Sequence, residues 1–208
     1  MRITGVIQAG GKSSRMGGRP KALIELGGRR LIERVTDALS GVFDDLLVVT
    51  NTPEIYRFLK LPLVPDAWLD HGSLGGIYSG LRAAPGDAAF TVACDMPFLH
   101  ADVIRLVARR AEEADVVIPR VGEQLETMHA LYRRTCLGPM EACLKAGRLK
   151  IVGFFDQVRV VEVPEAEVAE LADPAVVFMN VNTPDELARA QDLVARRPLT
   201  GRPGTDAS

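Results

Sequence analysis

A glycine-rich, basic segment near the start of the chain carries the residues best suited to bind phosphate. Residues 8–21 read QAGGKSSRMGGRPK, with four glycines among them. Glycines let a backbone bend and approach a ligand closely, and successive N–H groups in such a loop form an anion-binding concavity. Lys12, Arg15, Arg19 and Lys21 place four cations within ten residues. We therefore predict a phosphate-binding loop at this position.

Two familiar phosphate-binding patterns do not fit this loop. A Walker A pattern, GxxxxGK[ST], would end at Gly11-Lys12-Ser13, but its first glycine would then be residue 6, which is Val6. The dinucleotide pattern GxGxxG fails because Gly10 is followed two positions later by Lys12. These spacings exclude a P-loop ATPase and the usual NAD-binding fingerprint. The remaining alternative, a flexible loop with incidental charges, is disfavoured by the position of the loop directly after a predicted first strand.

Three further polar residues follow predicted buried strands, namely Asn51, Asp66 and Asp95. Asp95 is placed to hold a hard cation, and Mg²⁺ needs only one or two carboxylates beside the phosphates of a substrate; alternatively, Asp95 forms a cap or turn before Pro97. Asn51 and Asp66 suit a base edge or a ribose hydroxyl, although both residue types are also common in turns. Ligands of open parallel sheets bind beyond the carboxyl ends of the strands. One crevice could therefore hold the loop and all three residues.

Two amides near the end of the chain indicate a second polar region. Asn180 and Asn182 flank Val181 at a period of two, so both side chains point to one side of an extended segment. We predict that this side faces an acceptor phosphate. Arg148 and Lys150 could add positive charge there, or could lie on the solvated surface.

The elements that must position these residues alternate along the chain. Apolar runs predict strands at 3–7, 45–50, 61–64, 88–93, 115–119, 125–132, 158–163 and 178–181. Helical patterns cover 31–39, 73–84, 100–114, 133–146 and 183–195, the last capped by Thr183 with Pro184 at its first position. His129, in an apolar strand, is expected to be buried and hydrogen-bonded. The alternation predicts an α/β, Rossmann-like fold with a mostly parallel sheet and helices on both faces.

Length and composition indicate one globular domain. We expect a single domain over residues 1–195, with a nucleotide-binding half at 1–120 and an acceptor-binding half at 121–195. Residues 196–208 are rich in proline and glycine and are expected to form a disordered tail. A net charge of −2 argues against a nucleic-acid or membrane surface. The three cysteines have no CxxC spacing, so we expect reduced thiols in the cytoplasm, with Cys94 as a packed thiol.

Taken together, these motifs resemble a known family. Residues 8–21 are similar to the AGGxSxRMGxxK loop of sugar-nucleotide-type nucleotidyltransferases, and especially to that of the molybdenum cofactor guanylyltransferases. The likeness continues in HGSLGGI at 71–77, ACDMPFL at 93–99, MHALY at 128–132 and MNVNTP at 179–184. These segments span most of residues 3–195. The resemblance implies a fold of the nucleotide-diphospho-sugar transferase type.

The resemblance also implies an activity and a set of site residues. The family joins GMP from GTP to molybdopterin, releasing pyrophosphate, with Mg²⁺ as cofactor. Arg15, Lys21 and Asp95 would be catalytic, with Asp95 as the metal ligand. The implied nucleotide-binding residues are Gln8, Ala9, Gly10, Gly11, Lys21, Asn51, Asp66 and Asp95, and the implied acceptor-binding residues are Asn180, Asn182 and Lys150. The expected partners are GTP, molybdopterin and, transiently, cofactor-biosynthesis and molybdoenzyme-maturation proteins; we expect a cytoplasmic monomer.

The loop departs from the family pattern at two positions. Gln8 replaces the usual leucine, and Pro20 stands where an aspartate often precedes the lysine. Family members use the loop backbone at the first position, so we expect Gln8 to be tolerated. The alternatives are a cytidylyltransferase for the same pterin, a sugar-phosphate nucleotidyltransferase, or a non-catalytic nucleotide-binding protein of the same fold. The Ala-Gly-Gly form of the loop favours guanine, because the cytidylyl relatives tend toward Ala-Ala-Gly.

Overall fold

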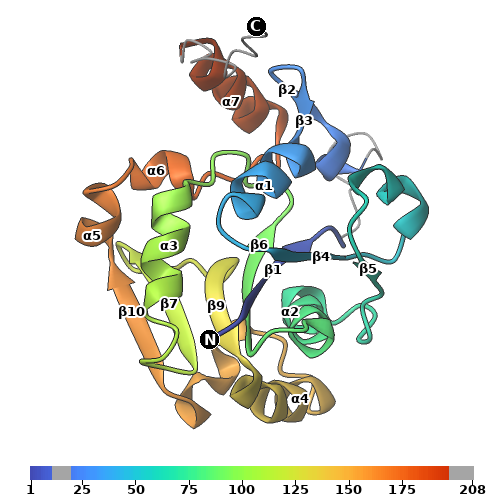
Figure 1. Ribbon diagram of the computed structural model, residues 1–208, viewed down its shortest axis with the longest axis vertical. Coiled ribbons are helices and arrows are strands. Elements are labelled where there is room, and N and C mark those ends of the chain that lie inside the picture. Colours follow the sequence, from blue (N-terminus) through green and yellow to red (C-terminus); the bar gives the residue numbers. More distant parts are fainter. Residues whose placement is uncertain (11–19, 197–208) are drawn as a thin grey trace, which may run out of the picture.

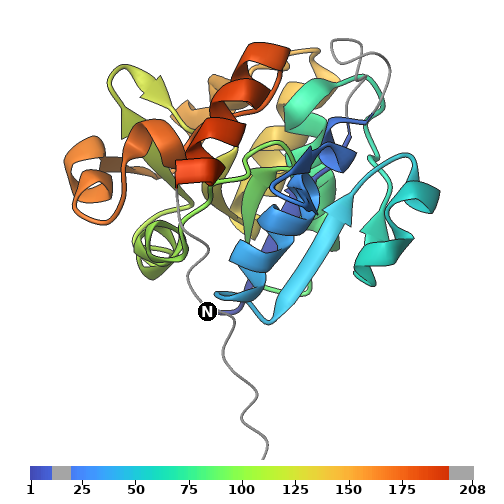
Figure 2. The same ribbon diagram turned by 90° about the horizontal axis from the view of Figure 1, so that it is seen from above.

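One mixed sheet runs through the whole molecule. The structure is a computed structural model that describes residues 1–10 and 20–196. The strand order is β10-β7-β9-β6-β1-β4-β5, with β8 paired to β7, so that both predicted halves contribute to one sheet (Figures 1 and 2). The strands are β1 (Ile3–Gln8), β4 (Asp45–Val49), β5 (Leu63–Val64), β6 (Ala88–Ala93), β7 (Val116–Val121), β8 (Gln124–Leu125), β9 (His129–Arg133) and β10 (Val160–Pro164).

Most strand pairs are parallel, as the apolar runs predict. β1 lies at the centre between β4 and β6, parallel to both, and β4–β5 and β7–β10 are also parallel. The antiparallel pairs of this sheet are β9 with β6 and with β7, and β8 with β7. The single strand predicted at 125–132 is two strands: β8 pairs with the end of β7, and a turn follows in which the Glu126 N–H donates to the Pro119 carbonyl.

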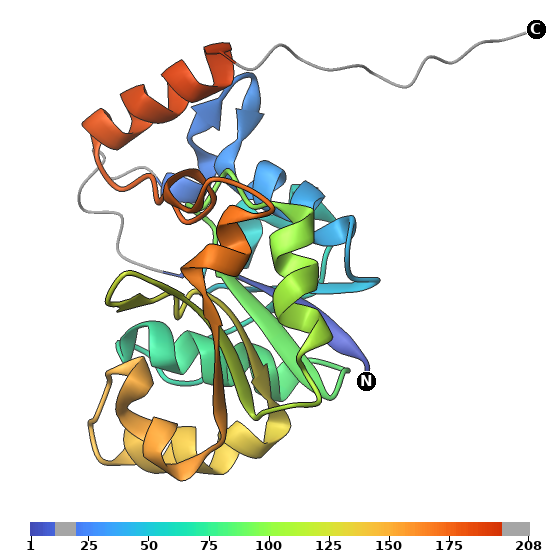
Figure 3. The same cartoon turned by 90° about the vertical axis from the view of Figure 1, so that its left-hand side faces the viewer.

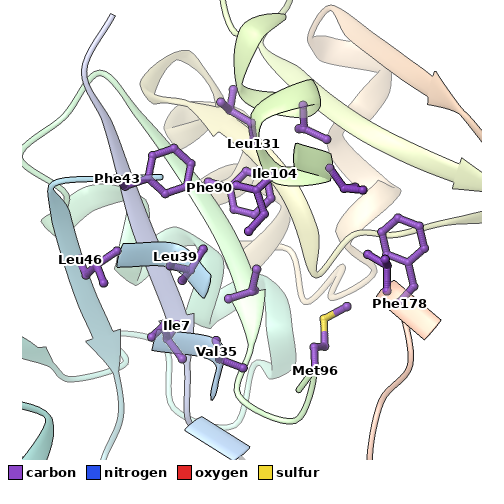
Figure 4. Packing of buried hydrophobic residues seen from close by; sticks show 14 of the residues in the cluster. Ile7, Val35, Leu39, Phe43, Leu46, Phe90, Met96, Ile104, Leu131 and Phe178 are labelled. Atoms are coloured by element: carbon purple, nitrogen blue, oxygen red, sulfur yellow. The ribbon is translucent and has the colours of Figure 1, made fainter. Parts of the chain in front are cut away.

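Helices cover both faces of the sheet. α1 (Leu31–Ser40) and α3 (Ala101–Arg109) lie on one face, and α2 (Gly72–Ala83) and α4 (Leu137–Lys145) lie on the other (Figures 1 and 3). On the α1 side, the Phe43 and Phe90 rings lie 5.6 Å apart beside Leu39 and Ile104 (Figure 4). The predicted α/β fold with helices on both faces is confirmed. No helix among the described residues is long and apolar enough to span a membrane.

A hairpin that the sequence did not predict forms a third apolar cluster with the last helix. β2 (Glu25–Leu26) and β3 (Arg29–Arg30) turn through Gly27 and Gly28, whose φ angles of 59° and 76° suit a two-residue hairpin turn. Leu26 packs with residues of α7 (Pro184–Arg196), which lies beside the hairpin (Figure 3). The Glu186 N–H donates to the Thr183 Oγ1, and the Glu186 carboxylate accepts the Thr183 N–H, so the predicted cap is confirmed as a capping box.

One strand predicted near the C-terminus is wrong, and the last helix ends one residue later than predicted. The structure has no strand at 178–181. Instead α6 (Pro174–Val177) follows α5 (Glu165–Ala169), with the Asp173 side chain accepting the Ala175 N–H, and the chain continues as an irregular segment. Strand pairing is replaced by one backbone bond, from the Val181 N–H to the Asp95 carbonyl. Helix α7 includes Arg196, the first residue of the predicted tail, and the rest of that tail lies outside the described residues.

His129 is buried as predicted, but the expected hydrogen bonds are missing. Its ring lies edge-on between Phe90 and Phe178, with centroids 5.0 Å away on each side. Neither ring nitrogen has a hydrogen-bond partner among the described residues. Burial lowers the pKa of His129 to about 4, so the ring is neutral at physiological pH and acts as an aromatic packing group.

Helix α2 packs against β1 so closely that one position requires glycine. A Cβ on Gly80 would lie 2.4 Å from Val6 Cγ1 and 3.1 Å from Val49 Cγ2. Replacing glycine by alanine in a helix normally stabilises the helix by about 1 kcal/mol. At Gly80 the steric overlap should make the replacement destabilising instead. We predict that Gly80→Ala lowers the free energy of unfolding by about 1–3 kcal/mol in urea denaturation.

Gly138→Ala is the matched control, because Gly138 lies in α4 and its Cβ would meet nothing within 4 Å. This variant should unfold at the same or a higher urea concentration than the parent protein. Equal behaviour of the two variants would contradict the close contact of α2 and β1.

Candidate functional site

Two adjoining cavities open at the carboxyl ends of the central strands. The wide cavity has a volume of about 780 Å³ and the narrow cavity about 290 Å³. Both are lined by Gln8, Ala9, Gly10, Pro20, Tyr56 and Ser73. The wide cavity adds Asn51, Asp66, Leu69, Asp70 and Gly76, with other residues of the same loops. The narrow cavity adds Lys21, Ala22, Ala93, Cys94, Asp95, Met128 and Asn180. The predicted crevice is therefore present as two connected compartments.

The central position of β1 explains why these segments converge. Gln8, its last residue, pairs in register with Val49 of β4 and Ala93 of β6. Past the strand ends, the Ala9 N–H donates to the Val49 carbonyl at 2.9 Å, and the Cys94 N–H donates to the Gln8 carbonyl at 3.1 Å. The three chains therefore leave the sheet side by side, and the residues that follow them face a common space.

Lys21 connects three segments that are distant in the sequence. Its Nζ donates to the Asn182 Oδ1 at 2.6 Å and lies 3.7 Å from the Asp95 Oδ2. The Asp95 carbonyl in turn accepts the Val181 N–H at 2.9 Å. Lys21 and Asp95 are both mostly buried, so these contacts are weakly screened by water. The lysine after the loop, the aspartate after β6 and the segment before α7 thus form one charged cluster.

The Asp95 carboxylate lies in an unfavourable environment for a negative charge. Burial raises its pKa, the Lys21 charge opposes this shift, and the Glu186 carboxylate adds to it. Glu186 is itself held by the N–H groups of Asn182 and Thr183, at 2.6 and 2.9 Å. A cation at Asp95 would therefore relieve a desolvated charge that Lys21 alone does not compensate.

The residues around Asp95 fit a magnesium ion that takes most of its ligands from a bound substrate. Mg²⁺ prefers oxygen ligands and is commonly bound by one or two carboxylates together with phosphates and water. Within residues 1–10 and 20–196 there is no cluster of three His, Cys, Asp or Glu side chains that would make an all-protein metal site. The single carboxylate of Asp95, facing the narrow cavity, suits a metal that arrives with a nucleotide.

Asn51 and Asp66 line the wide cavity and also stabilise its wall. The Asn51 Oδ1 accepts the Asp66 N–H at 2.9 Å. The Asp66 Oδ1 accepts the Trp68 N–H at 3.0 Å and the Ser79 hydroxyl at 2.9 Å. The turn interpretation of Asp66 is therefore confirmed, since its side chain closes a local turn. Nucleoside binding by either residue stays a prediction.

The remaining predicted residues divide between the cavities, the surface and the undescribed loop. Asn180 lines the narrow cavity, and its amide donates to the Phe178 carbonyl at 3.3 Å. Lys150 is exposed, immediately before the 3₁₀ helix Ile151–Gln157, and it lines neither cavity. Gly11 and Arg15 lie outside the described residues. The binding roles of all four stay predictions.

Tyr56 and Cys94 also line the site. Tyr56, which the sequence analysis missed, lines both cavities and donates from its hydroxyl to the Ala9 carbonyl at 3.4 Å. It follows a short 3₁₀ helix in a polar stretch, where no pattern sets it apart. Burial raises the pKa of the Cys94 thiol to about 12, so Cys94 is a packed thiol, as predicted, rather than a nucleophile.

Comparisons with known proteins show the family of this chain. Residues 5–160 match the family model of the MobA-like NTP transferase domain. The chain is 39% identical to the probable molybdenum cofactor guanylyltransferase of Pelotomaculum thermopropionicum, covering 97% of this chain and 98% of the relative. It is 40% identical to the molybdenum cofactor guanylyltransferase of Desulfosudis oleivorans, covering 91% and 94%.

A solved structure extends the likeness to three dimensions. The molybdopterin-guanine dinucleotide biosynthesis protein A of Archaeoglobus fulgidus matches with a TM-score of 0.81 and 25% identity, covering 93% of this chain and all of that one. The fold and the strand-end crevice thus define an α/β nucleotidyltransferase. Within that class, the chain belongs to the MobA-like NTP transferase family, whose similar members are named molybdenum cofactor guanylyltransferases.

The contact between Lys21 and Asn182 should contribute measurably to stability. It is a short, partly buried hydrogen bond to a charged donor, and we expect Asn182→Ala to lower the free energy of unfolding by about 1–2 kcal/mol. Asn180→Ala is the matched control, because its amide makes one longer, neutral bond, and its loss should be smaller. Urea denaturation of the two variants checks this. Equal losses would contradict the importance of the Lys21 contact.

Proposed function

We propose that this protein transfers GMP from GTP to the phosphate of molybdopterin, releasing pyrophosphate. The observation that carries the proposal is the Lys21–Asp95–Asn182 cluster at the narrow cavity, next to a wide cavity of about 780 Å³. Pockets of this size commonly hold small-molecule ligands. The names of relatives at 39–40% identity over nearly the whole chain support the choice of substrates.

The reaction needs electrostatic positioning more than a base. An oxygen of the acceptor phosphate attacks the α-phosphorus of GTP, the bond from that phosphorus to the oxygen shared with the β-phosphorus breaks, and pyrophosphate leaves with the bonding electron pair. A phosphate monoester has its second pKa near 6, so the attacking oxygen carries no proton at neutral pH. Negative charge on the phosphoryl oxygens must be stabilised by the protein.

Lys21 and Asp95 have complementary roles in this proposal. The Lys21 ammonium, held by Asn182, faces the narrow cavity beside residues 8–10, where it would neutralise phosphate oxygens. Asp95 would hold Mg²⁺, which would supply positive charge to offset that of the phosphate oxygens. Asn51 and Asp66 would contact the nucleoside from the wide cavity, while Asn180 and Asn182 would meet the acceptor phosphate. The protein would act in the cytoplasm as a monomer, with transient contacts to proteins that deliver the pterin and receive the product.

The choice of nucleotide tests the proposed function directly. Purified protein would be incubated with molybdopterin, Mg²⁺ and one nucleoside triphosphate at a time, with pyrophosphate release as the measurement. We expect release with GTP and at least about tenfold less with CTP or ATP, because one well-made base contact is worth about that factor. A preference for CTP would replace the guanylyl assignment with a cytidylyl one. Nucleotide binding without pyrophosphate release would indicate a non-catalytic binding protein.

Removing the Asp95 charge should separate activity from stability. We expect Asp95→Asn to lower Mg²⁺-dependent turnover by about 10²–10³-fold. Burial raises the pKa of Asp95, so the folded protein holds its proton to higher pH than the unfolded chain, and the ionised carboxylate lowers stability at neutral pH. The melting temperature of ligand-free Asp95→Asn should therefore equal or exceed that of the parent protein.

The same pKa shift predicts a pH dependence. As the pH falls, Asp95 takes up a proton at a higher pH than an exposed aspartate, whose pKa is near 3.9. We therefore expect the affinity for the Mg²⁺-nucleotide to fall as the solution is acidified, beginning at a pH above the range in which exposed aspartates titrate. Asp192→Asn, on the exposed surface of α7, is the control and should keep both affinity and turnover. Full turnover of Asp95→Asn would remove Asp95 from the mechanism.

A further inference from the structure

A buried amide without a hydrogen-bond partner among the described residues lies in the wall of the crevice. Gln8 is only 9% exposed, at the end of β1, and it lines both cavities. Its Nε2 has no hydrogen-bond partner among the described residues. Leaving a buried donor unsatisfied is unfavourable, and buried polar groups in proteins are nearly always paired. An amide in this state at the edge of a ligand cavity is a binding group that a ligand completes.

The neighbouring helix accommodates this side chain specifically. A Cβ on Gly76, in the middle of α2, would lie 2.5 Å from the Gln8 Oε1 and 2.9 Å from its Cδ. Glycine in a helix interior weakens the helix, and here it leaves room for the carboxamide. The Oε1 rests against α2, whereas the Nε2 lies farther away, 3.4 Å from the same Cβ position. The glycine therefore leaves room for the carboxamide, whose Oε1 is nearer to α2 at this position than its Nε2.

The position of Gln8 indicates what kind of ligand group it meets. Gln8 and Gly76 share the wide cavity with Asn51 and Asp66, whereas Lys21 and Asp95 line only the narrow one. Because Gln8 is neutral and also lines the wide cavity, which Lys21 and Asp95 do not line, it suits a nucleobase better than a phosphate. Guanine presents two adjacent acceptors, N7 and O6, on one edge, whereas adenine and cytosine each carry an amino donor there. An NH₂ group therefore meets two acceptors on guanine, one acceptor (N7) on adenine and only an amino donor on cytosine.

We propose that the Gln8 carboxamide donates to the N7/O6 edge of the guanine base and so strengthens the selection of GTP in this chain. The inference rests on the proposed use of GTP and adds a side-chain contact at a position where the family usually has leucine. Gln8 is a specificity residue rather than a group that touches the reacting atoms. Because leucine-containing relatives lack this contact, it should add one hydrogen bond to the selection rather than supply all of it.

The test measures nucleotide affinity in the absence of acceptor, so that no turnover interferes. Dissociation constants of GTP, 6-thio-GTP, 7-deaza-GTP and CTP, each with Mg²⁺, would be determined by calorimetry for the parent protein, Gln8→Leu and Gln8→Glu. We expect Gln8→Leu to weaken GTP binding about tenfold and to leave CTP binding nearly unchanged. Gln8→Glu, which places a carboxylate against base acceptors, should weaken GTP binding further. Gln157→Leu is the matched control, since Gln157 is exposed and lines neither cavity, and it should bind GTP like the parent.

The modified bases test the same contact without relying on a variant. The parent protein should bind 6-thio-GTP or 7-deaza-GTP more weakly than GTP, and Gln8→Leu should lose that difference. Ligand-free Gln8→Leu should melt at the same or a higher temperature than the parent, because it removes an unpaired buried amide.

Two results would overturn the proposal alone: equal losses of GTP and CTP affinity in Gln8→Leu, or no loss for either modified base in the parent. Failure of the parent protein to prefer GTP over CTP would instead overturn the proposed function as well.

Discussion

The charge on Asp95 is the constraint on which the rest of the site depends. A buried carboxylate needs a counter-charge, and Lys21, the last residue of the predicted phosphate-binding loop, supplies it at 3.7 Å. Lys21 is in turn held by Asn182, and the Val181 N–H bonds the Asp95 carbonyl. The hairpin β2–β3 and helix α7 pack together directly beside these contacts. The apolar cluster of Leu26, Val181 and Ala190 therefore stabilises the segments that carry these side chains. It keeps Lys21 and Asn182 close to Asp95.

The site retains two unfavourable groups. Asp95 keeps a raised pKa despite its lysine neighbour, and Gln8 keeps a buried donor unpaired. An unpaired buried donor costs roughly 1–3 kcal/mol in the free protein, which is a substantial fraction of the stability of a typical domain. His129 is also unpaired, but it lies between two aromatic rings, where a neutral imidazole packs as a small ring. The distinction is location: Gln8 and Asp95 line a cavity, whereas His129 lines neither of the two.

The sequence predicted most of what depends on local pattern and little that depends on distant contacts. The apolar runs of β1, β4 and β6 gave the central strands, and the polar residues after them gave the crevice, because parallel strands end at one edge. The hairpin was missed because its strands have two residues each and β3 is a pair of arginines. The prediction of a strand at 178–181 was wrong because its apolar residues pack in apolar clusters and the segment does not pair with a strand. The bond from Lys21 to Asn182 joins residues 161 positions apart, and no local pattern encodes it.

Substitutions in the two cavities are expected to affect different parts of the proposed function. They share the backbone of residues 8–10 as a common wall. In the proposed reaction the triphosphate must cross this wall, with the base on the wide side and the reacting phosphorus on the side of Lys21 and Asp95. A side chain such as Gln8 can then alter base selection while its backbone stays paired to β4 and β6. Lys21 has no such freedom, because its ammonium also holds Asn182 of the C-terminal segment. The catalytic side is constrained by the fold itself, whereas the base side is open to variation at a single residue.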